Sequence, residues 1–226
     1  MISIALIFPG QGAQEPGMGR EFYDSSPQAK TIFDKANAII PGLVDVIFNG
    51  PADKLTSTQY CQPAIFTFSV AALAALKVHP KFKNIEPKFA CGLSLGEYSA
   101  LTASGALSFE ETLRLVERRS FFMEEATKAV KGKMAAILGF DKDKLIEICR
   151  ATGAQVANFN SPDQIVITGE AAKVEAACEK IKEAGAKRVI VLDVSGAFHS
   201  RLMQSAQDKF HLELTKVNLK NCSIVY

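Results

Sequence analysis

The chain lacks the cysteine and charge patterns that mark several classes of protein. Its five cysteines are scattered without the short spacings of metal ligands, and their odd number argues against a complete disulfide framework. We therefore expect no metal site and a reducing, cytoplasmic compartment. The formal net charge is only +2, with acidic and basic residues interspersed, so the sequence has no electrostatic footprint for nucleic acid or a membrane surface.

Long hydrophobic runs are also absent. The N-terminal stretch 1–8 is too short for the apolar region of a signal peptide and has no basic flank, so it indicates a first buried strand. The longest apolar run, 64–78, contains polar residues and is shorter than the roughly 18 residues of a membrane span. We expect a buried helix there and no membrane segment.

The composition and the order of the predicted elements favour a soluble α/β protein. With 226 residues and 48% hydrophobic side chains, the chain is large enough to bury a core. Residues 1–130 read as apolar strands alternating with helices, as in a mainly parallel sheet. Residues 131–196 read instead as β-α-β-β-α-β, the ferredoxin-like order. We predict a large subdomain of 1–130 and 197–226, with a small ferredoxin-like subdomain inserted at 131–196.

The most informative stretch has the signature of a nucleophile elbow. An apolar run ending near Cys91 leads into Gly92-x-Ser94-x-Gly96, and helix-compatible residues continue to Gly105. At such a strand-to-helix turn the serine hydroxyl is exposed, and the flanking glycines let neighbouring backbone pass close by. The pattern predicts a nucleophilic Ser94. The alternative is an ordinary glycine-rich turn with a solvated serine.

Arg119 falls on the apolar side of a predicted helix. Ser108 and Glu111 form a capping-box pattern, which predicts a helix over 109–129. At about 100° per residue, Arg119 lies in the middle of the apolar stripe of that helix. Because an unpaired buried charge is costly, an anion should meet this side chain. That anion is either an internal carboxylate or a substrate carboxylate held by the planar guanidinium.

The base and the oxyanion donors are less strongly marked. The chain has three histidines, and only His199 lies at a junction with the predicted insert, where loops often line clefts. His199 is therefore the best candidate base for Ser94, with a purely structural histidine as the alternative. The loop 8–12 is either a plain turn or the source of one oxyanion N–H group, the other coming from Leu95.

Together these residues resemble a known family, the malonyl-CoA:acyl carrier protein transacylases of fatty acid synthesis. The resemblance covers essentially the whole chain. It is carried by six motifs in order, namely Pro9-Gly-Gln-Gly12, Gln62-Pro-Ala64, Gly92-x-Ser-Leu-Gly-Glu-Tyr-Ser-Ala-Leu101, Arg114-Leu-Val-Glu-x-Arg119, Asn158-Phe-Asn-Ser-Pro162 and Gly196-Ala-Phe-His-Ser200. It implies an α/β-hydrolase-like large domain with a ferredoxin-like insert and a ping-pong acyl transfer.

The resemblance also implies a role for each site residue. Ser94 would carry the malonyl group as an ester, with His199 as its general base. The backbone N–H groups of Gln11 and Leu95 would hold the oxyanion, and Arg119 would pair with the malonate carboxylate. Gln62 and Asn160 would complete the substrate-binding set. Malonyl-CoA and acyl carrier protein are the expected partners of a cytoplasmic monomer that needs no cofactor and no metal.

The sequence departs from the family pattern in two places. Leu93 precedes the nucleophile, where the family usually carries histidine. Family members also continue for several dozen residues beyond position 226, so we expect the C-terminal part of the large subdomain to be missing, with a segment that orients His199. Three alternatives stay open: a trans-acting acyltransferase of polyketide synthesis, a serine esterase of similar architecture, and a non-catalytic scaffold.

Overall fold

A computed structural model describes all residues of the chain, 1–226, as two compact units. The first unit comprises Met1–Ser120 and Glu213–Tyr226, and the second comprises Phe121–Leu212. The predicted insert 131–196 falls inside the second unit. That unit also takes in flanking helical residues on both sides, because they pack against its sheet. The subdomain boundaries at 131 and 196 therefore stay a prediction.

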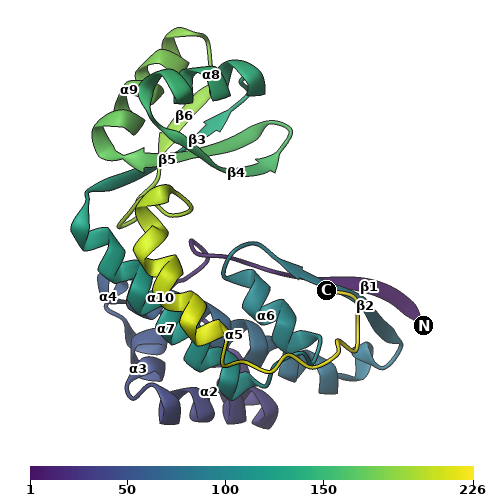
Figure 1. Ribbon diagram of the computed structural model, residues 1–226. Helices are drawn as coiled ribbons and strands as arrows, with labels where there is room; N and C mark the ends of the chain where they lie inside the picture. The colour runs from purple at the N-terminus through teal and green to yellow at the C-terminus, as the bar shows by residue number, and fades with distance from the viewer. The chain divides into compact units, whose positions relative to one another are not determined.

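Two strands and a set of helices form the first unit (Figure 1). In chain order they are β1 (Ile2–Phe8), α1 (Arg20–Ser25), α2 (Pro27–Ile39), α3 (Leu43–Asn49), α4 (Ala52–Thr56), α5 (Thr58–Val78), the short 3₁₀ helix η1 (Pro80–Phe82), β2 (Ile85–Gly92), α6 (Gly96–Ala103) and the start of α7 (Phe109–Ala129). The expected arrangement of strands and helical segments with a parallel sheet is confirmed, although five α-helices separate β1 from β2.

The two strands pair in parallel, and their side chains alternate between the two faces. Phe8 and Ala90 point inward and pack with residues of α5 and α6, whereas Ile7 and Phe89 on the opposite face are exposed. Val225 forms an isolated parallel bridge to Phe89, so the C-terminal residues lie beside β2. The strands are therefore present at the predicted positions, but they are buried on one face only.

The apolar run of the sequence lies in α5. This helix begins at Thr58, six residues before the predicted apolar segment, and carries Pro63 in its second turn. By length and composition α5 would qualify as a membrane span, but most of its most apolar window is buried inside the structure. Its side chains pack with α2 and α3 in the main core of the first unit. The prediction of a buried core helix is confirmed.

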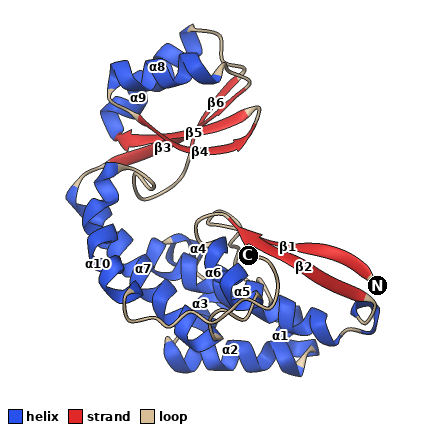
Figure 2. Ribbon diagram, turned by 45° about the vertical axis from the view of Figure 1, so that its right-hand side comes forward, coloured by secondary structure: helices blue, strands red, loops and turns tan.

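The second unit is built on a four-stranded antiparallel sheet. Its elements are β3 (Gly132–Leu138), α8 (Lys142–Thr152), β4 (Gln155–Ser161), β5 (Gln164–Glu170), α9 (Ala171–Glu183) and β6 (Arg188–Val191), followed by the 3₁₀ helix η2 (Arg201–Met203) and α10 (Gln204–Leu214). The strands lie in the order β4-β5-β3-β6, the ferredoxin-like arrangement. Helices α8 and α9 cover one face (Figure 2), and residues of α7 and α10 pack on the other.

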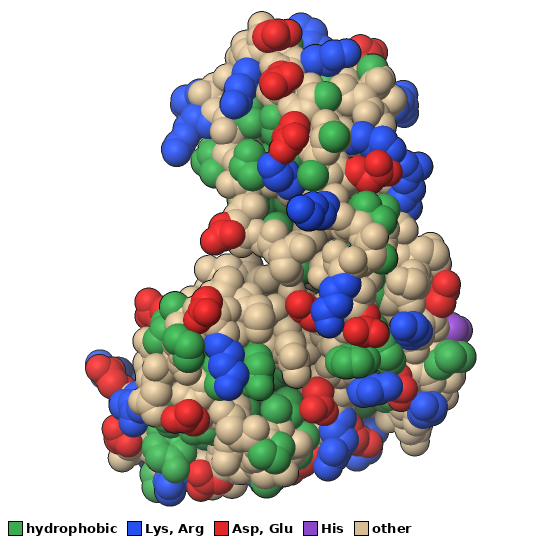
Figure 3. Space-filling model, turned by 90° about the vertical axis from the view of Figure 1, so that its left-hand side faces the viewer, with side chains coloured by type: hydrophobic (Ala, Val, Ile, Leu, Met, Phe, Trp, Pro, Cys, Tyr) green, Lys and Arg blue, Asp and Glu red, His purple; other side chains and the backbone are tan.

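Charged side chains are mixed over the surface. One face of the molecule shows basic and acidic groups interspersed without a region of a single sign (Figure 3). Several of them pair, as Lys35 does with Glu110 and Lys133 with Glu175. Pairs this exposed contribute little to stability. The charge pattern agrees with the near-neutral balance of the sequence.

Candidate active site

Ser94 lies on a sharp turn between β2 and α6. Strand β2 ends at Gly92 and helix α6 begins at Gly96, so only three residues separate them. A Cβ built on Gly92 would lie 2.1 Å from the carbonyl carbon of Gly96, and one built on Gly96 would lie 2.4 Å from the Phe8 oxygen. The backbone therefore passes too close for any side chain at either glycine. This is the geometry that the G-x-S-x-G pattern predicted.

Backbone strain singles out the two residues expected to do the chemistry. Ser94 has φ 55° and His199 has φ 58°, and they are the only residues other than glycine with a positive φ. A side chain in this left-handed region costs of order 1–3 kcal/mol and persists only where the surroundings enforce it. Such strain concentrates at functional sites, so the backbone independently favours a functional role for both residues.

The side chain of Arg119 reaches the predicted nucleophile. Its Nη2 donates a hydrogen bond to Ser94 Oγ at 2.8 Å, and its Nη1 donates to Gln62 Oε1. The guanidinium also lies over the ring of Tyr98, 5.5 Å from the ring centre. None of the ion pairs in the chain involves Arg119. Burial lowers the pKa of this group, while Tyr98 and the charge of Glu97 oppose the shift.

That geometry argues against one of the two hypotheses for Arg119. An internal carboxylate does not meet it, so its partner is a side-chain amide, a hydroxyl and an aromatic ring. Gln62 is almost fully buried and comes from α5, where sequence periodicity alone would place it among core residues. The cationic head has no carboxylate within ion-pair distance and donates to the hydroxyl of Ser94.

The loop after β1 runs beside the nucleophile turn. A Cβ on Gly10 would lie 3.2 Å from the carbonyl oxygen of Leu93, and Gly96 packs against the backbone of Phe8. The N–H groups of Gln11 and Leu95 donate no hydrogen bond within the chain. Two unengaged backbone donors thus lie on segments that meet around Ser94, as an oxyanion hole requires.

His199 and Asn160 belong to the second unit. His199 is exposed and lies in the loop between β6 and η2, with Phe198 before it and Ser200 after it. Asn160 is exposed near the end of β4, and its Nδ2 donates to Gln164 Oε1 at 2.8 Å. The first unit therefore brings Ser94, Arg119, Gln62 and the two backbone donors together, while His199 and Asn160 lie on segments of the second unit.

Comparison with known proteins identifies the family. The model of the acyl transferase domain matches residues 5–226. The chain belongs to this family. It is 46% identical to the malonyl CoA-acyl carrier protein transacylase of Bacillus subtilis, over 99% of this chain and 71% of that protein.

Solved structures of the family have the same fold. The malonyl CoA-acyl carrier protein transacylase of Clostridium perfringens is 39% identical and superimposes with a TM-score of 0.88, over 98% of this chain and 70% of the other. A malonyl-transacylase solved in complex with a type II polyketide acyl-carrier protein is 34% identical, with a TM-score of 0.91 over 99% and 73% of the two chains. The resemblance and the α/β fold inferred from the sequence are confirmed.

Two residues near the acyl transferase site were given no role in the sequence analysis. Tyr98 lies one helical turn after Ser94, and burial raises its pKa while the Arg119 charge opposes the shift. Cys61 is buried next to Gln62, and burial raises the pKa of its thiol to about 12, although a hydrogen bond from the Gly12 backbone opposes this. The thiol therefore stays protonated at neutral pH and does not compete with Ser94 as a nucleophile.

Proposed function

We propose that this protein transfers the malonyl group of malonyl-CoA to the phosphopantetheine thiol of acyl carrier protein, through a malonyl ester of Ser94, in fatty acid biosynthesis. The names of its relatives support this substrate and this acceptor. The observation that carries the proposal is the Arg119 guanidinium, which has only neutral partners and lies 2.8 Å from the Ser94 hydroxyl.

The chemistry is an acyl transfer in two half-reactions. Ser94 Oγ attacks the thioester carbonyl of malonyl-CoA while His199 takes the hydroxyl proton, and the tetrahedral intermediate then expels the CoA thiol, which receives that proton. The thiol of the carrier protein attacks the resulting ester in the same way and regenerates Ser94. The N–H groups of Gln11 and Leu95 stabilise the oxyanion in both steps.

Arg119 selects the substrate by its free carboxylate. A planar guanidinium binds a carboxylate through two parallel hydrogen bonds, and Gln62 holds one of its nitrogens in place. An acetyl group would leave the cation unpaired, and a site that leaves a polar group unpaired rejects such an analogue strongly. A serine esterase has no need of this cation, which argues against that alternative.

The remaining parts of the proposal concern partners and conditions. Asn160 is proposed as a substrate-binding residue on the second unit, and neither a cofactor nor a metal takes part in the reaction. We propose a cytoplasmic monomer. The relative bound to a type II polyketide carrier protein makes polyketide synthesis the second candidate pathway, because the acyl transfer itself would be identical.

Intact-mass measurement after incubation with malonyl-CoA, and separately with acetyl-CoA, tests the proposal. We expect a malonyl adduct on the wild-type chain, no adduct with Ser94→Ala, and loss of the preference for malonyl over acetyl with Arg119→Ala. Gln62→Ala should weaken malonyl transfer less than Arg119→Ala, because the Gln62 side chain only orients the guanidinium. A wild-type chain that is acylated equally by both thioesters would contradict the role of Arg119.

A further inference from the structure

The strained conformation of His199 is enforced by contacts on both sides of its loop. The residue has φ 58°, a value that an L-residue leaves unless its neighbours fix it. Its own side chain is exposed, so burial of the imidazole does not supply the constraint. The residues that precede and follow it make contacts that hold the loop.

Before His199 the loop is attached to β5. Thr168 is fully buried in that strand, and its Oγ1 donates a hydrogen bond to the backbone oxygen of Phe198 at 2.9 Å. The Phe198 side chain is buried in the cluster formed by α7, α10 and the sheet. A threonine hydroxyl thus fixes the carbonyl group of the peptide that enters His199, in a place that water does not reach.

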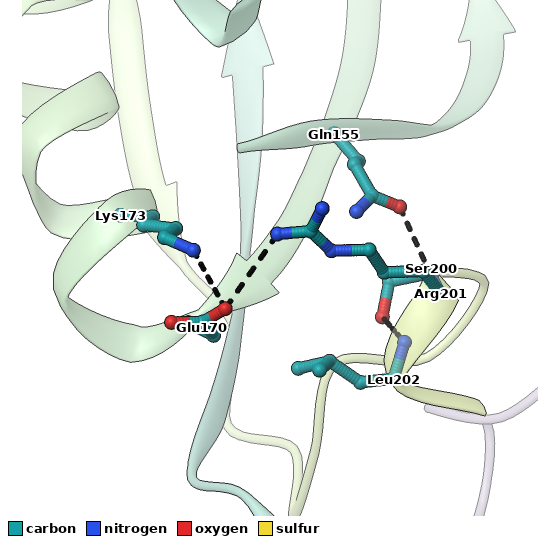
Figure 4. Close-up of polar contacts among 6 residues, drawn as sticks. All are labelled: Gln155, Glu170, Lys173, Ser200, Arg201 and Leu202. Carbon is teal, nitrogen blue, oxygen red and sulfur yellow. Dashed lines mark hydrogen bonds and ion pairs between the residues drawn. The ribbon is translucent and has the colours of Figure 1, made fainter. Parts of the chain in front are cut away.

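After His199 the loop is attached to β4 and β5. The backbone N–H of Arg201 donates to Gln155 Oε1 at 3.0 Å, and the Arg201 guanidinium lies 3.6 Å from the carboxylate of Glu170 (Figure 4). Ser200 closes the turn by donating to the Ala197 oxygen. The ion pair is exposed and weak, so the amide of Gln155 is the stronger anchor on this side.

Close packing leaves this loop little freedom to move. A Cβ on Gly132 of β3 would lie 2.4 Å from the nitrogen of Ala197, and one on Gly196 would lie 2.3 Å from the Cγ2 of Thr127. The backbone therefore lies directly on the sheet and on α7, with no room for an added methyl group. Hydrogen bonds and sterics together determine where the loop runs.

We propose that Thr168 and Gln155 are positioning residues that hold the His199 loop in its strained conformation. The ferredoxin-like sheet then serves as the support of the general base, with one strand fixing the peptide before His199 and another the peptide after it. The expected effect on malonyl transfer rests on the proposed function, whereas the hold of the two residues on the loop rests only on their hydrogen bonds.

Two measurements on the full chain test this proposal. Thr168→Val keeps the shape and the strand propensity of the side chain and removes only the hydroxyl. We expect kcat for malonyl transfer to fall about tenfold with KM changed less than twofold, and Thr168→Ser to restore most of the rate. Hydrogen exchange of the peptide 196–202 should become faster in Thr168→Val and return towards the wild-type rate in Thr168→Ser.

A matched variant separates positioning from stability. Thr152 in α8 also donates its hydroxyl to a backbone oxygen, that of Ile148 in the same helix, so Thr152→Val removes a partly buried hydroxyl–carbonyl hydrogen bond away from the loop. It should leave both kcat and the exchange of 196–202 unchanged. Gln155→Met, at a partly exposed position, should reproduce the effects of Thr168→Val. Gln155→Glu keeps an acceptor oxygen and should therefore keep kcat and the exchange of 196–202 close to the wild-type values.

The outcomes distinguish this proposal from the proposed function. If the wild-type chain forms no malonyl ester, the function fails, and hydrogen exchange still decides whether the two residues hold the loop. Unchanged exchange and unchanged kcat in both Thr168→Val and Gln155→Met, with an active wild type, overturn the positioning role. Equal losses in Thr168→Val and Thr152→Val would also overturn it, because they would reflect stability alone.

Discussion

Ser94 in the first unit and His199 in the second share an unfavourable backbone conformation, but they are held in it by different means. At Ser94 the constraint is local, because Gly92 and Gly96 allow a strand to turn into a helix within three residues. At His199 we propose that the constraint comes from two earlier strands, through contacts of Thr168 and Gln155 with residues 30 and 46 positions later in the chain.

The difference explains why one site could be found in the sequence and the other could not. A local turn has to carry its glycines at fixed positions around the serine, so the conformation leaves a readable pattern. A loop held by tertiary contacts needs only a hydroxyl and an amide somewhere in the chain. His199 was therefore proposed by elimination among three histidines, whereas Ser94 followed from its motif.

The largest effect is expected from closing the space at the nucleophile turn. In Gly92→Ala the new methyl group would overlap the carbonyl carbon of Gly96, and backbone cannot give way as a flexible side chain does. We expect a loss of about 3 kcal/mol or more in unfolding free energy and loss of acylation at Ser94. Denaturant unfolding and intact-mass labelling measure the two effects.

Gly42→Ala serves as the control for this variant. Gly42 has φ +82° with nothing within 4 Å of an added Cβ, so alanine there would meet strain without a clash. We expect a loss of about 1 kcal/mol and full activity. If Gly92→Ala were no more harmful than Gly42→Ala, the turn at Ser94 would not depend on close backbone packing, and the local half of the comparison would fail.

Much of the fold was predictable where the sequence has a regular hydrophobic period, a helix cap or clear turn residues. The capping box is present, since the Glu111 N–H bonds Ser108 Oγ and the Glu111 carboxylate bonds the Ser108 N–H. The β-α-β-β-α-β order was also correct, because glycine and turn residues separate each element. Helices α1 to α4 were not foreseen individually, since α1, α3 and α4 span only five to seven residues and all four helices pack on α5.

The surroundings of Arg119 were only partly predictable. Helical periodicity placed it on the apolar side, but whether an internal carboxylate or an external one would meet it depended on packing between α5 and α7. Gln62 stands among core residues, and its pattern gives no hint that its amide turns towards the arginine. A contact between two residues 57 positions apart follows from tertiary structure and not from local sequence.

Relieving the backbone strain at Ser94 or His199 is expected to raise the unfolding free energy, a smaller effect and opposite in sign to that of Gly92→Ala. Ser94→Gly removes the nucleophile and also the cost of a side chain at φ 55°, so the variant should lose all acylation yet gain about 1 kcal/mol of unfolding free energy. His199→Gly should gain a similar amount. Denaturant unfolding measures both, and Ser94→Ala, which keeps a Cβ in the strained conformation, is the control that should not gain.

A stability gain at one position only would sharpen the comparison. If Ser94→Gly gains and His199→Gly does not, contacts of the His199 side chain compensate for its strain. If neither variant gains, glycine loses as much through its freedom in the unfolded chain as it recovers in the native turn. A loss of stability in both variants would contradict the explanation by stored strain.

The smallest effect concerns buried thiols, one in each unit, and is absent at neutral pH. Burial raises the pKa of Cys61 in the first unit to about 12 and that of Cys149 in the second to about 11, from a usual value near 9. Because the folded state keeps its proton longer than the unfolded state, the stability that each thiol contributes is complete below pH 9 and is lost as the pH rises towards its folded value. Each thiol should lower the unfolding free energy by about 1 kcal/mol between pH 9 and pH 10, so Cys61→Ala and Cys149→Ala should each flatten this decline relative to wild type. Denaturant unfolding at pH 7, 9 and 10 measures this decline. If the unfolding free energy falls equally in wild type and in both variants, neither thiol is shielded from water as the packing of its unit indicates.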